Sequence, residues 1–397
     1  MRTHHRALLS LLIATSLVLV ACSEQSSPGS AAGSPTASES LKPVASSALS
    51  ARYEPKTEAS HGRIALTGKP VMNVYAAAGS SQLSEVVASF PERVYVPDNL
   101  AGTADVIDPA TYKVIAHFRV GRSPQHITPS WDLQHLYVNN TAGNSLTVIN
   151  PRTCKPTGTI PIADPYNLYF TTNGAMAIVV SERKRRLDFR DARTWNLIKS
   201  VQIPWRGVDH LDFSADGSYL LASTEFSGEV VRVDVVAMAV TGELKVGGLA
   251  VDVKLAPDGS VFYVANQMRN GVSVIDPQRM REIAFIATGP GAHGLYVSRD
   301  AKQLYVSNRR AGSISVIDFA TRRVSATWRI GGSPDMIQLS PDGRQLWVSN
   351  RYNSSVSVVD TVTGQLLRVI RVGGGPHGLS YFPQPGRFSL GHNGVYR

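Results

Sequence analysis

A repeat of about 42 residues is the feature that most constrains the fold of this chain. A β-branched stretch ending in Asp or Asn recurs seven times, with successive end residues 42, 41, 43, 42, 42 and 42 residues apart. Turn dipeptides such as Asp258-Gly259 and Asp342-Gly343 separate alternating apolar runs within the units. Repeats of this length with four short strands are typical of propeller blades. The sequence therefore predicts an all-β, seven-bladed β-propeller of four-stranded blades. The end residues are Asp108, Asn150, Asp191, Asp234, Asp276, Asp318 and Asp360.

The order of the predicted strands also predicts how the ring closes. The first blade lacks an innermost strand of its own, whereas a spare strand, 377–382, follows the last complete blade. We expect this C-terminal strand to pair with the strand 94–97, because closure removes an exposed edge.

The first 21 residues have the features of a bacterial lipoprotein signal peptide. Basic residues come first, an apolar stretch runs from Ala7 to Val20, and Leu19-Val20-Ala21-Cys22 resembles a lipobox. We expect cleavage before Cys22 and lipidation of its thiol, so that the membrane is a partner through this lipid. The resulting cell-envelope lipoprotein is expected at the outer membrane and periplasm of a Gram-negative cell, or at the surface of a Gram-positive cell.

Three further segments make up the rest of the chain. Residues 22–61 are mostly Ser, Ala, Gly, Pro and Thr, which cannot bury a core, so they predict a flexible tether. Residues 62–92 form an N-terminal extension whose apolar stretch 71–78 either adds a strand or crosses one end of the channel. Residues 93–397 hold the propeller and a short C-terminal tail that the repeat does not place.

The repeat motifs resemble one known family. Tyr-Val-x-Asn strands, Val-Ile-Asp-Pro strand ends and a Gly-Gly-x-Pro-His-Gly turn are similar to those of the YVTN family of β-propeller repeats, of the YncE type, over residues 94–382. The resemblance implies an exported seven-bladed propeller, and most members have no assigned activity. Related propellers include the haem d1 domain of cytochrome cd1 nitrite reductase and lactonase-like proteins. That kinship implies a ligand site at the channel mouth.

The innermost strands are predicted to bring a ring of polar residues to one mouth of the channel. Their first two positions contain four of the ten histidines of the chain and three aspartates. The candidate ligand-binding residues of this ring are Gln125, His126, Tyr166, Asp209, His210, Asp252, His293, Asp335 and His377.

Three kinds of chemistry are open to such a ring, beside the simple lining of a wet channel. Imidazoles and carboxylates can bind a transition metal, for which His293, Asp335 and His377 from three successive blades are the best local cluster. An imidazole can be the axial ligand of a tetrapyrrole, and a His–Asp pair can act as a general base. Spacing alone does not show which geometry forms.

The loops predicted on the same face are rich in arginine, and the net charge of the chain is +10. Arg183, Arg309 and Arg351 are therefore further candidates, which would attract an anionic small molecule or an envelope protein. The basic run 183–186 lacks interleaved aromatic residues, which does not favour nucleic acid.

No catalytic motif with its required context is present, so the sequence favours a binding protein, expected to be monomeric, over an enzyme. The expected function is a lipid-anchored propeller that binds a small anionic ligand, a cofactor or an envelope partner on its basic, histidine-bearing face. The alternative is a metal- or tetrapyrrole-binding propeller with hydrolytic or redox activity.

Overall fold

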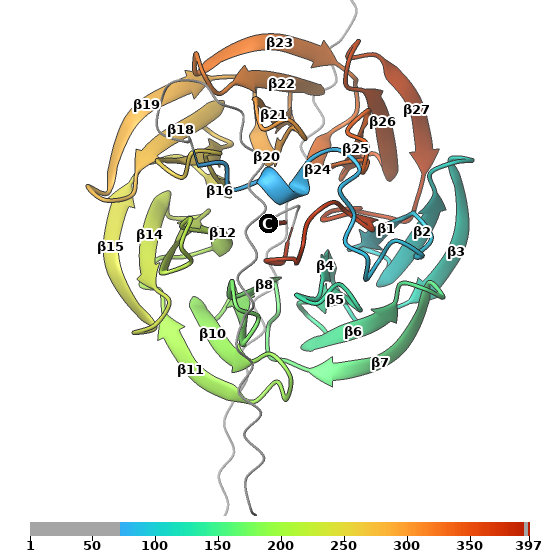
Figure 1. Ribbon diagram of the computed structural model, residues 1–397, viewed down its shortest axis with the longest axis horizontal. Coiled ribbons are helices and arrows are strands. Elements are labelled where there is room, and N and C mark those ends of the chain that lie inside the picture. The colour runs from blue at the N-terminus through green and yellow to red at the C-terminus, as the bar shows by residue number, and fades with distance from the viewer. Residues whose placement is uncertain (1–71, 393–395) are drawn as a thin grey trace, which may run out of the picture. The chain divides into compact units, whose positions relative to one another are not determined.

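The computed structural model describes residues 72–392 and 396–397. The predicted signal peptide, Cys22, the tether 22–61 and the start of the extension lie outside the described residues. The described part is an all-β protein of seven four-stranded antiparallel sheets arranged as blades around a channel, as predicted (Figure 1). Its one helix is the short 3-10 turn η1 (Ala76–Ala78), and no described helix could cross a membrane.

Each blade runs from an innermost strand to an outermost strand, and the first blade takes its innermost strand from the C-terminus. The blades are β28 (Ser380–Phe382), β1 (Arg93–Asp98), β2 (Thr103–Asp108), β3 (Lys113–Arg119); β4 (Pro124–Pro129), β5 (Leu136–Asn140), β6 (Ser145–Asn150), β7 (Lys155–Pro161); β8 (Asn167–Phe170), β9 (Met176–Ser181), β10 (Arg186–Asp191), β11 (Leu197–Gln202); β12 (Val208–Phe213), β13 (Tyr219–Thr224), β14 (Glu229–Asp234), β15 (Ala239–Lys245); β16 (Ala250–Leu255), β17 (Phe262–Asn266), β18 (Gly271–Asp276), β19 (Arg281–Ala287); β20 (Ala292–Val297), β21 (Gln303–Asn308), β22 (Ser313–Asp318), β23 (Arg323–Arg329); β24 (Pro334–Leu339), β25 (Gln345–Asn350), β26 (Ser355–Asp360) and β27 (Leu366–Arg371).

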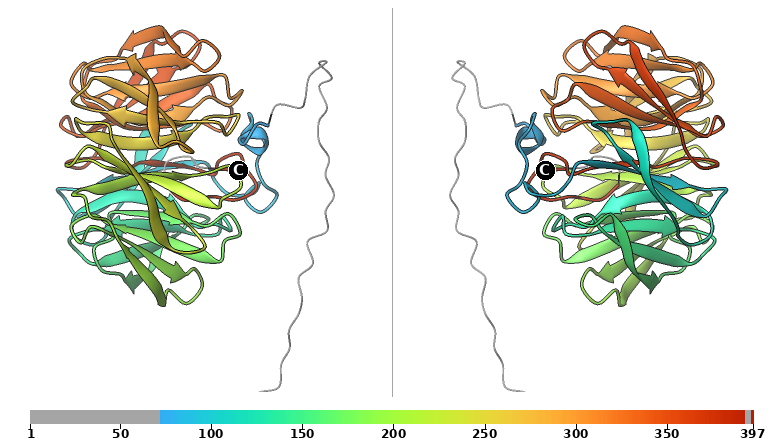
Figure 2. Two further views of the ribbon diagram at one scale, coloured as in Figure 1. Left: turned by 90° about the vertical axis from the view of Figure 1, so that its left-hand side faces the viewer. Right: turned by 90° about the vertical axis from the view of Figure 1, so that its right-hand side faces the viewer.

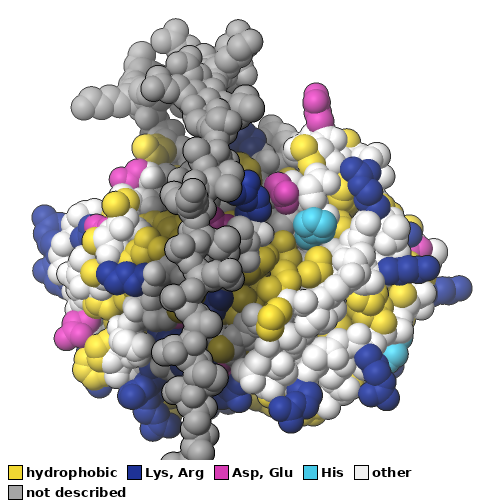
Figure 3. Space-filling view, turned by 90° about the horizontal axis from the view of Figure 1, so that it is seen from below, with side chains coloured by type: hydrophobic (Ala, Val, Ile, Leu, Met, Phe, Trp, Pro, Cys, Tyr) yellow, Lys and Arg dark blue, Asp and Glu magenta, His cyan; other side chains and the backbone are white. Residues whose placement is uncertain are grey.

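Burial follows the position of a strand in its blade. All residues of the innermost strand β12 are buried, whereas the outermost strand β23 alternates between exposed and half-buried residues. An inner strand is covered by neighbouring blades on both faces, and an outermost strand has one face in water. Figure 3, which views the edge of the ring, shows Lys and Arg scattered over the outer strands rather than gathered in one patch.

The C-terminal strand closes the ring as predicted. β28 pairs with β1 in the register Arg93–Phe382, Val94–Tyr381 and Tyr95–Ser380. The strand begins at Ser380, three residues later than the predicted start at His377. The cause is a competing partner: Gly378 N–H donates to the Gln125 carbonyl (2.8 Å), and Ile127 N–H donates to the Gly378 carbonyl (3.0 Å). The preceding segment is thus tied to the innermost strand of the second blade.

One face of the ring, here the closed face, is covered by the N-terminal segment 72–92. Val74 N–H donates to the Pro257 carbonyl and Ser81 N–H to the Pro341 carbonyl, each at 2.9 Å, and both acceptors lie in turns between the first two strands of a blade. Between these anchors η1 lies over the end of the channel, as the front and side views agree (Figures 1 and 2). The apolar part of this extension therefore crosses one end of the channel and adds no strand to a blade.

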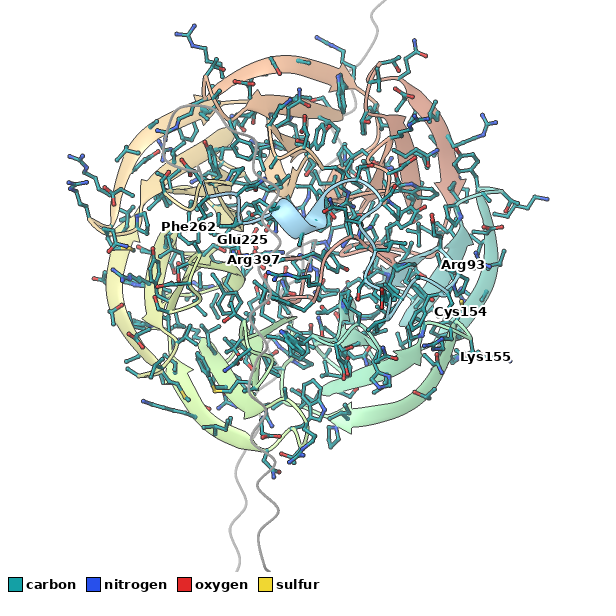
Figure 4. The ribbon with its side chains drawn as sticks, viewed as in Figure 1. Arg93, Cys154, Lys155, Glu225, Phe262 and Arg397 are labelled. Atoms are coloured by element: carbon teal, nitrogen blue, oxygen red, sulfur yellow. The ribbon has the colours of Figure 1, made fainter. Side chains whose placement is uncertain are left out.

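The end of the chain fills the channel behind that cover. We call residues 387–392 and 396–397 the C-terminal plug. Phe170 N–H donates to the Leu390 carbonyl (3.0 Å), so this segment runs along β8. Arg397 is buried, lies 3.2 Å from Asp212, and donates to the carbonyls of Phe213 and Ser214 at 2.9 Å (Figure 4). The opposite face, which carries the loops between the second and third strands and is called the open face, is not crossed by any described residue outside the blades.

Candidate functional site

A break in the strand register directs the predicted ring residues into the channel. In five of the seven innermost strands the pairing skips the second and third residues, as between Pro124 and Ile127 or between Pro334 and Ile337. The bulge leaves the skipped residues free to project inwards. Serines of the adjacent strand hold it: Ser223 Oγ accepts from His210 N–H at 3.2 Å, and Ser307 Oγ from Gly294 N–H at 2.7 Å.

One group of side chains surrounds a buried carboxylate, and we call it the Asp335 cluster (His293, Arg309, Asp335, His377). The Asp335 oxygens lie 3.0 Å from Nδ1 of His293 and 2.9 Å from Nδ1 of His377. The Arg309 guanidinium contacts both the Asp335 carboxylate and Nε2 of His293. Since a guanidinium has only donors, Nε2 of His293 accepts and its proton sits on Nδ1, facing Asp335. The Tyr166 hydroxyl lies 3.4 Å from Nε2 of His377.

Burial and the neighbouring charges determine which groups of the Asp335 cluster are ionised. Burial raises the pKa of Asp335, but Arg309 and the two imidazoles lower it by more, so it lies well below its usual range. Burial lowers the pKa of His293, with Arg309 adding to the effect, and lowers the pKa of His377 to about 3. The cluster is therefore an Arg309–Asp335 ion pair flanked by two neutral rings.

A second group, the three-histidine cluster, consists of His126 from β4, His210 from β12 and His392 from the C-terminal plug. One nitrogen of each ring lies within 4.8 Å of the others. The ring centroids are 4.0 Å apart for His126 and His392, 4.8 Å for His210 and His392, and 5.2 Å for His126 and His210. All three side chains are buried, and none of their six ring nitrogens has a hydrogen-bond partner among the described residues.

The protonation of this cluster differs from ring to ring. Burial lowers the pKa of His126 and of His392 well below the usual value, and the neighbouring imidazoles add to the effect. Burial acts in the same direction on His210, but Asp209 raises its pKa by more, so the balance lies above the usual value. Nδ1 of His210 lies 3.1 Å from Asp209, without the alignment of a hydrogen bond. His126 and His392 are therefore neutral rings with unused lone pairs.

A third group forms a ring at the mouth of the channel on the open face. Each member is the first residue after the second strand of its blade, and successive members are 42, 41, 43, 42, 42 and 42 residues apart. The asparagine that ends many of these strands fixes the loop, as where Asn308 Nδ2 donates to Ser315 Oγ at 3.0 Å. The members of this mouth ring are Asn99, Thr141, Glu182, Glu225, Gln267, Arg309 and Arg351.

The mouth ring is acidic over two adjacent blades and basic over two others. Burial raises the pKa of Glu182 to about 8 and that of Glu225 to about 7, with repulsion from Asp209 adding to both. Gln267 connects the two sides, because its Nε2 lies 3.4 Å from Glu225 and its Oε1 lies 3.1 Å from Arg309. Figure 4 shows Glu225 near the centre of the ring of blades. At neutral pH the arginines therefore carry most of the charge at the mouth.

The predicted candidates divide between the channel and structural roles. His126, Tyr166, Asp209, His210, His293, Asp335 and His377 are all buried in the channel, and Gln125 is half-buried beside them. Asp252 is held differently, since it accepts from Leu295 N–H at 2.8 Å and ties two innermost strands together. Arg183 is occupied by Asp164 at 2.6 Å and by the Thr141 carbonyl at 2.8 Å.

The metal group predicted from the sequence, His293, Asp335 and His377, does come together, but Arg309 occupies the position beside the carboxylate. A guanidinium already supplies the positive charge there. The residues that sequence reasoning missed are His392 and Glu225. Aligning the residue after each second strand would have found Glu225, whereas nothing in the repeat reaches the tail that carries His392.

The described residues form seven blades around a channel that the segment 72–92 covers at one end and that polar clusters line, with the mouth ring at the other end. This arrangement defines a seven-bladed β-propeller. A family model described as YNCE-like beta-propeller matches residues 63–385. The chain therefore belongs to the YncE-like β-propeller family, in agreement with the resemblance of its repeat motifs.

Several solved structures share the fold. The periplasmic gluconolactonase PpgL of Pseudomonas aeruginosa is 20% identical, with a TM-score of 0.62 over 74% of this chain and 99% of that chain. The dihydro-haem d1 dehydrogenase NirN is 17% identical, with a TM-score of 0.57 over 73% and 75%. The hydrazine synthase of Kuenenia stuttgartiensis is 18% identical, with a TM-score of 0.56 over 64% and 87%. No curated protein matches the sequence. At these sequence identities the comparison shows a shared fold and assigns no activity to this chain.

Proposed function

We propose that this protein is an exported, lipid-anchored propeller that binds a small anionic ligand at its mouth ring. The observation that carries the proposal is the state of Arg351. Its side chain is only 23% exposed, its Nη1 lies 3.7 Å from Asp335, and it makes no hydrogen bond to any described residue. The Arg351 guanidinium lies at the open mouth of the channel and has unused donors. Such a group can bind a carboxylate, sulfate or phosphate in a forked geometry.

The opposite side of the mouth does not oppose such a ligand at neutral pH. Because the pKa values of Glu182 and Glu225 are raised to about 8 and about 7, Glu182 is mostly protonated near neutrality and Glu225 is about half protonated. A protonated carboxyl group can donate a hydrogen bond to an anion and does not repel it. An anion bound by Arg351 would therefore meet donors from both sides of the mouth.

Calorimetry on the full-length protein, extracted in detergent, tests the proposal with citrate and sulfate as probes. Arg351→Gln is expected to weaken binding about tenfold, since a hydrogen bond to a charged group contributes roughly 1.5–3 kcal/mol. Arg310→Gln is the matched control, because Arg310 lies in a neighbouring loop, is exposed, and bonds to Asn270 at 2.7 Å. Equal affinities of Arg351→Gln and the natural protein would overturn the proposal.

The lipid anchor has a separate test. Cys22→Ser removes the thiol that would carry the lipid, so the protein is expected to move from the membrane fraction to the soluble fraction of lysed cells. Membrane association that persists in this variant would contradict the lipobox interpretation and leave the ligand site unaffected.

The alternative of a cofactor propeller divides into two cases. A tetrapyrrole does not fit among the channel histidines, because the three rings are buried and their centroids lie only 4.0–5.2 Å apart. A single metal ion is small enough to bind between the three rings.

A further inference from the structure

We infer that His126, His210 and His392 form a binding site for a divalent transition-metal ion, completed by the C-terminal end of the chain. Three imidazoles converge there from the second blade, the fourth blade and the C-terminal plug, with one nitrogen of each within 4.8 Å of the others. This site is separate from the anion site at the mouth ring and does not depend on it.

The imidazoles of the three-histidine cluster have no other partner among the described residues. All six ring nitrogens are buried and bond to none of these residues. Each unsatisfied buried polar group costs about 1–3 kcal/mol, and folded proteins rarely leave several of them together. His377 in the same channel shows the usual solution, since its Nδ1 lies 2.9 Å from the Asp335 carboxylate and its Nε2 lies 3.4 Å from the Tyr166 hydroxyl. A metal ion is the partner that would satisfy all three imidazoles at once.

The surroundings of His210 and His126 select one nitrogen of each ring for the metal. Nδ1 of His210 lies 3.1 Å from Asp209, which leaves Nε2 for a ligand. A carboxylate behind a metal-bound imidazole orients the ring and raises its basicity. For His126, Nδ1 lies against the backbone of Gly378 so closely that a Cβ atom there would overlap it, which again leaves Nε2.

The donor set defines the class of metal. Three imidazole nitrogens suit Zn²⁺, Cu²⁺, Ni²⁺ or Co²⁺ and not the hard cations Mg²⁺ and Ca²⁺. With bonds of about 2.0–2.1 Å, the nitrogens of a tetrahedral site stand roughly 3.3 Å apart, so binding draws the three rings together. A three-histidine set leaves a fourth position for water or another small ligand.

Binding at this site would also link distant parts of the chain. His126 and His210 belong to different blades, while His392 is held by its own N–H, which donates to the Leu168 carbonyl at 3.1 Å. A metal bound to all three would attach the C-terminal plug to the channel wall. Because a ligand that binds only the folded state stabilises it, the metal should raise the melting temperature.

The test titrates the full-length, detergent-extracted protein with Zn²⁺ in a calorimeter after removal of metal by a chelator, and with Co²⁺ as a probe of visible absorption. One Zn²⁺ per chain is expected. His126→Ala, His210→Ala and His392→Ala should each weaken binding by at least about 100-fold, the upper end of what loss of an outer-shell partner does. The Co²⁺ absorption bands should be absent in each of these three variants.

Two control variants separate this site from its competitors. His135→Ala removes an exposed histidine and should change nothing. His117→Ala removes the exposed member of Asp98, Asp105 and His117, the other group among the described residues whose ligand atoms lie within 4.8 Å of one another. Binding that is lost in His117→Ala and kept in the three channel variants would overturn the inference, as would binding that none of the substitutions changes.

A stability measurement separates metal ligands from ordinary core residues. Without metal, His392→Ala should melt at or above the temperature of the natural protein, because it removes an unsatisfied polar ring. With Zn²⁺, only the natural protein and the controls should gain stability. A variant that loses stability without metal and gains as much as the natural protein with Zn²⁺ would show a packing role and overturn the assignment. Arg351→Gln should bind Zn²⁺ as tightly as the natural protein does. The proposals of an anion site and of a metal site can therefore be disproved independently.

Discussion

The two histidine clusters of the channel differ in how far the protein itself satisfies them. In the Asp335 cluster, His293 and His377 each face a carboxylate oxygen at 3.0 Å or 2.9 Å, and Arg309 neutralises the carboxylate. In the three-histidine cluster, the imidazole nitrogens of His126 and His392 bond to no described residue. Both clusters are buried in one channel, and His126 and His377 lie only 4.6 Å apart between ring centroids.

The comparison teaches that residue type alone does not define a binding site. A buried histidine with both nitrogens engaged is part of the structure, whereas a group of buried histidines with free lone pairs is prepared for a partner from outside. The two clusters should therefore respond in opposite ways when they are disturbed: one in stability and the other in metal binding.

The largest expected effect comes from breaking the satisfied cluster. Asp335→Asn leaves the Arg309 charge buried without its counter-ion, and loss of one partner of a buried ion pair typically costs about 3–5 kcal/mol. We expect a fall of this size in the free energy of unfolding, measured by urea denaturation. Asp300→Asn is the control, since Asp300 is 56% exposed and pairs with Lys302 at 3.7 Å on the surface. A loss no larger than that of the control would mean that the Asp335 cluster does not act as a unit.

A smaller effect on stability, with a larger effect on metal binding, is expected from Gly378→Ala. The new methyl group would overlap the imidazole of His126 and turn that ring out of the three-histidine cluster. Overpacking of this kind usually costs about 1–3 kcal/mol, while Zn²⁺ affinity should fall by at least about tenfold. In the matched control Gly374→Ala, the added carbon meets its nearest atom, Leu100 Cβ, at 3.5 Å, an ordinary contact. If both variants bind Zn²⁺ like the natural protein, the position of His126 does not control the site.

The fold could be predicted because the strand and turn motifs of a blade recur seven times in the sequence. The blades share similar strand ends and turns. A unit whose motifs match the repeat poorly, such as 166–202, can therefore be predicted as a blade from the units on either side of it. Closure by the C-terminal strand followed from counting strands. The start of that strand was displaced from His377 to Ser380 because Gly378 pairs with the second blade, a contact between residues far apart in the sequence.

The candidate site was predictable only in part. Position in the repeat placed His126, His210 and His293 in the channel, because equivalent residues of equivalent strands share one location. It did not show that Arg309 fills the space beside Asp335, since the reach of a long side chain across blades depends on packing. It also did not place His392, because the C-terminal plug follows the last repeat and is positioned by contacts such as those to β8 and to Phe213 and Ser214. Periodicity therefore identified the ring but not the membership of each cluster.

The smallest expected effect lies at the mouth ring, above both clusters, and depends on pH. The pKa of Glu182 is raised to about 8, first by burial and then by Asp209, Glu225 and Asp164, with Arg183 acting in the opposite direction. A raised carboxyl pKa means that Glu182 is neutral below about pH 8 and negative above it. Affinity for sulfate should therefore fall as the pH rises from about 7 to about 9, by roughly fivefold, or about 1 kcal/mol. Glu182→Gln cannot ionise and should flatten this dependence while keeping the affinity measured at the lower pH. A variant whose affinity still falls as steeply would place the titrating group elsewhere in the mouth ring. Zn²⁺ binding by the three-histidine cluster should be independent of sulfate binding, because Arg351→Gln should weaken only sulfate binding.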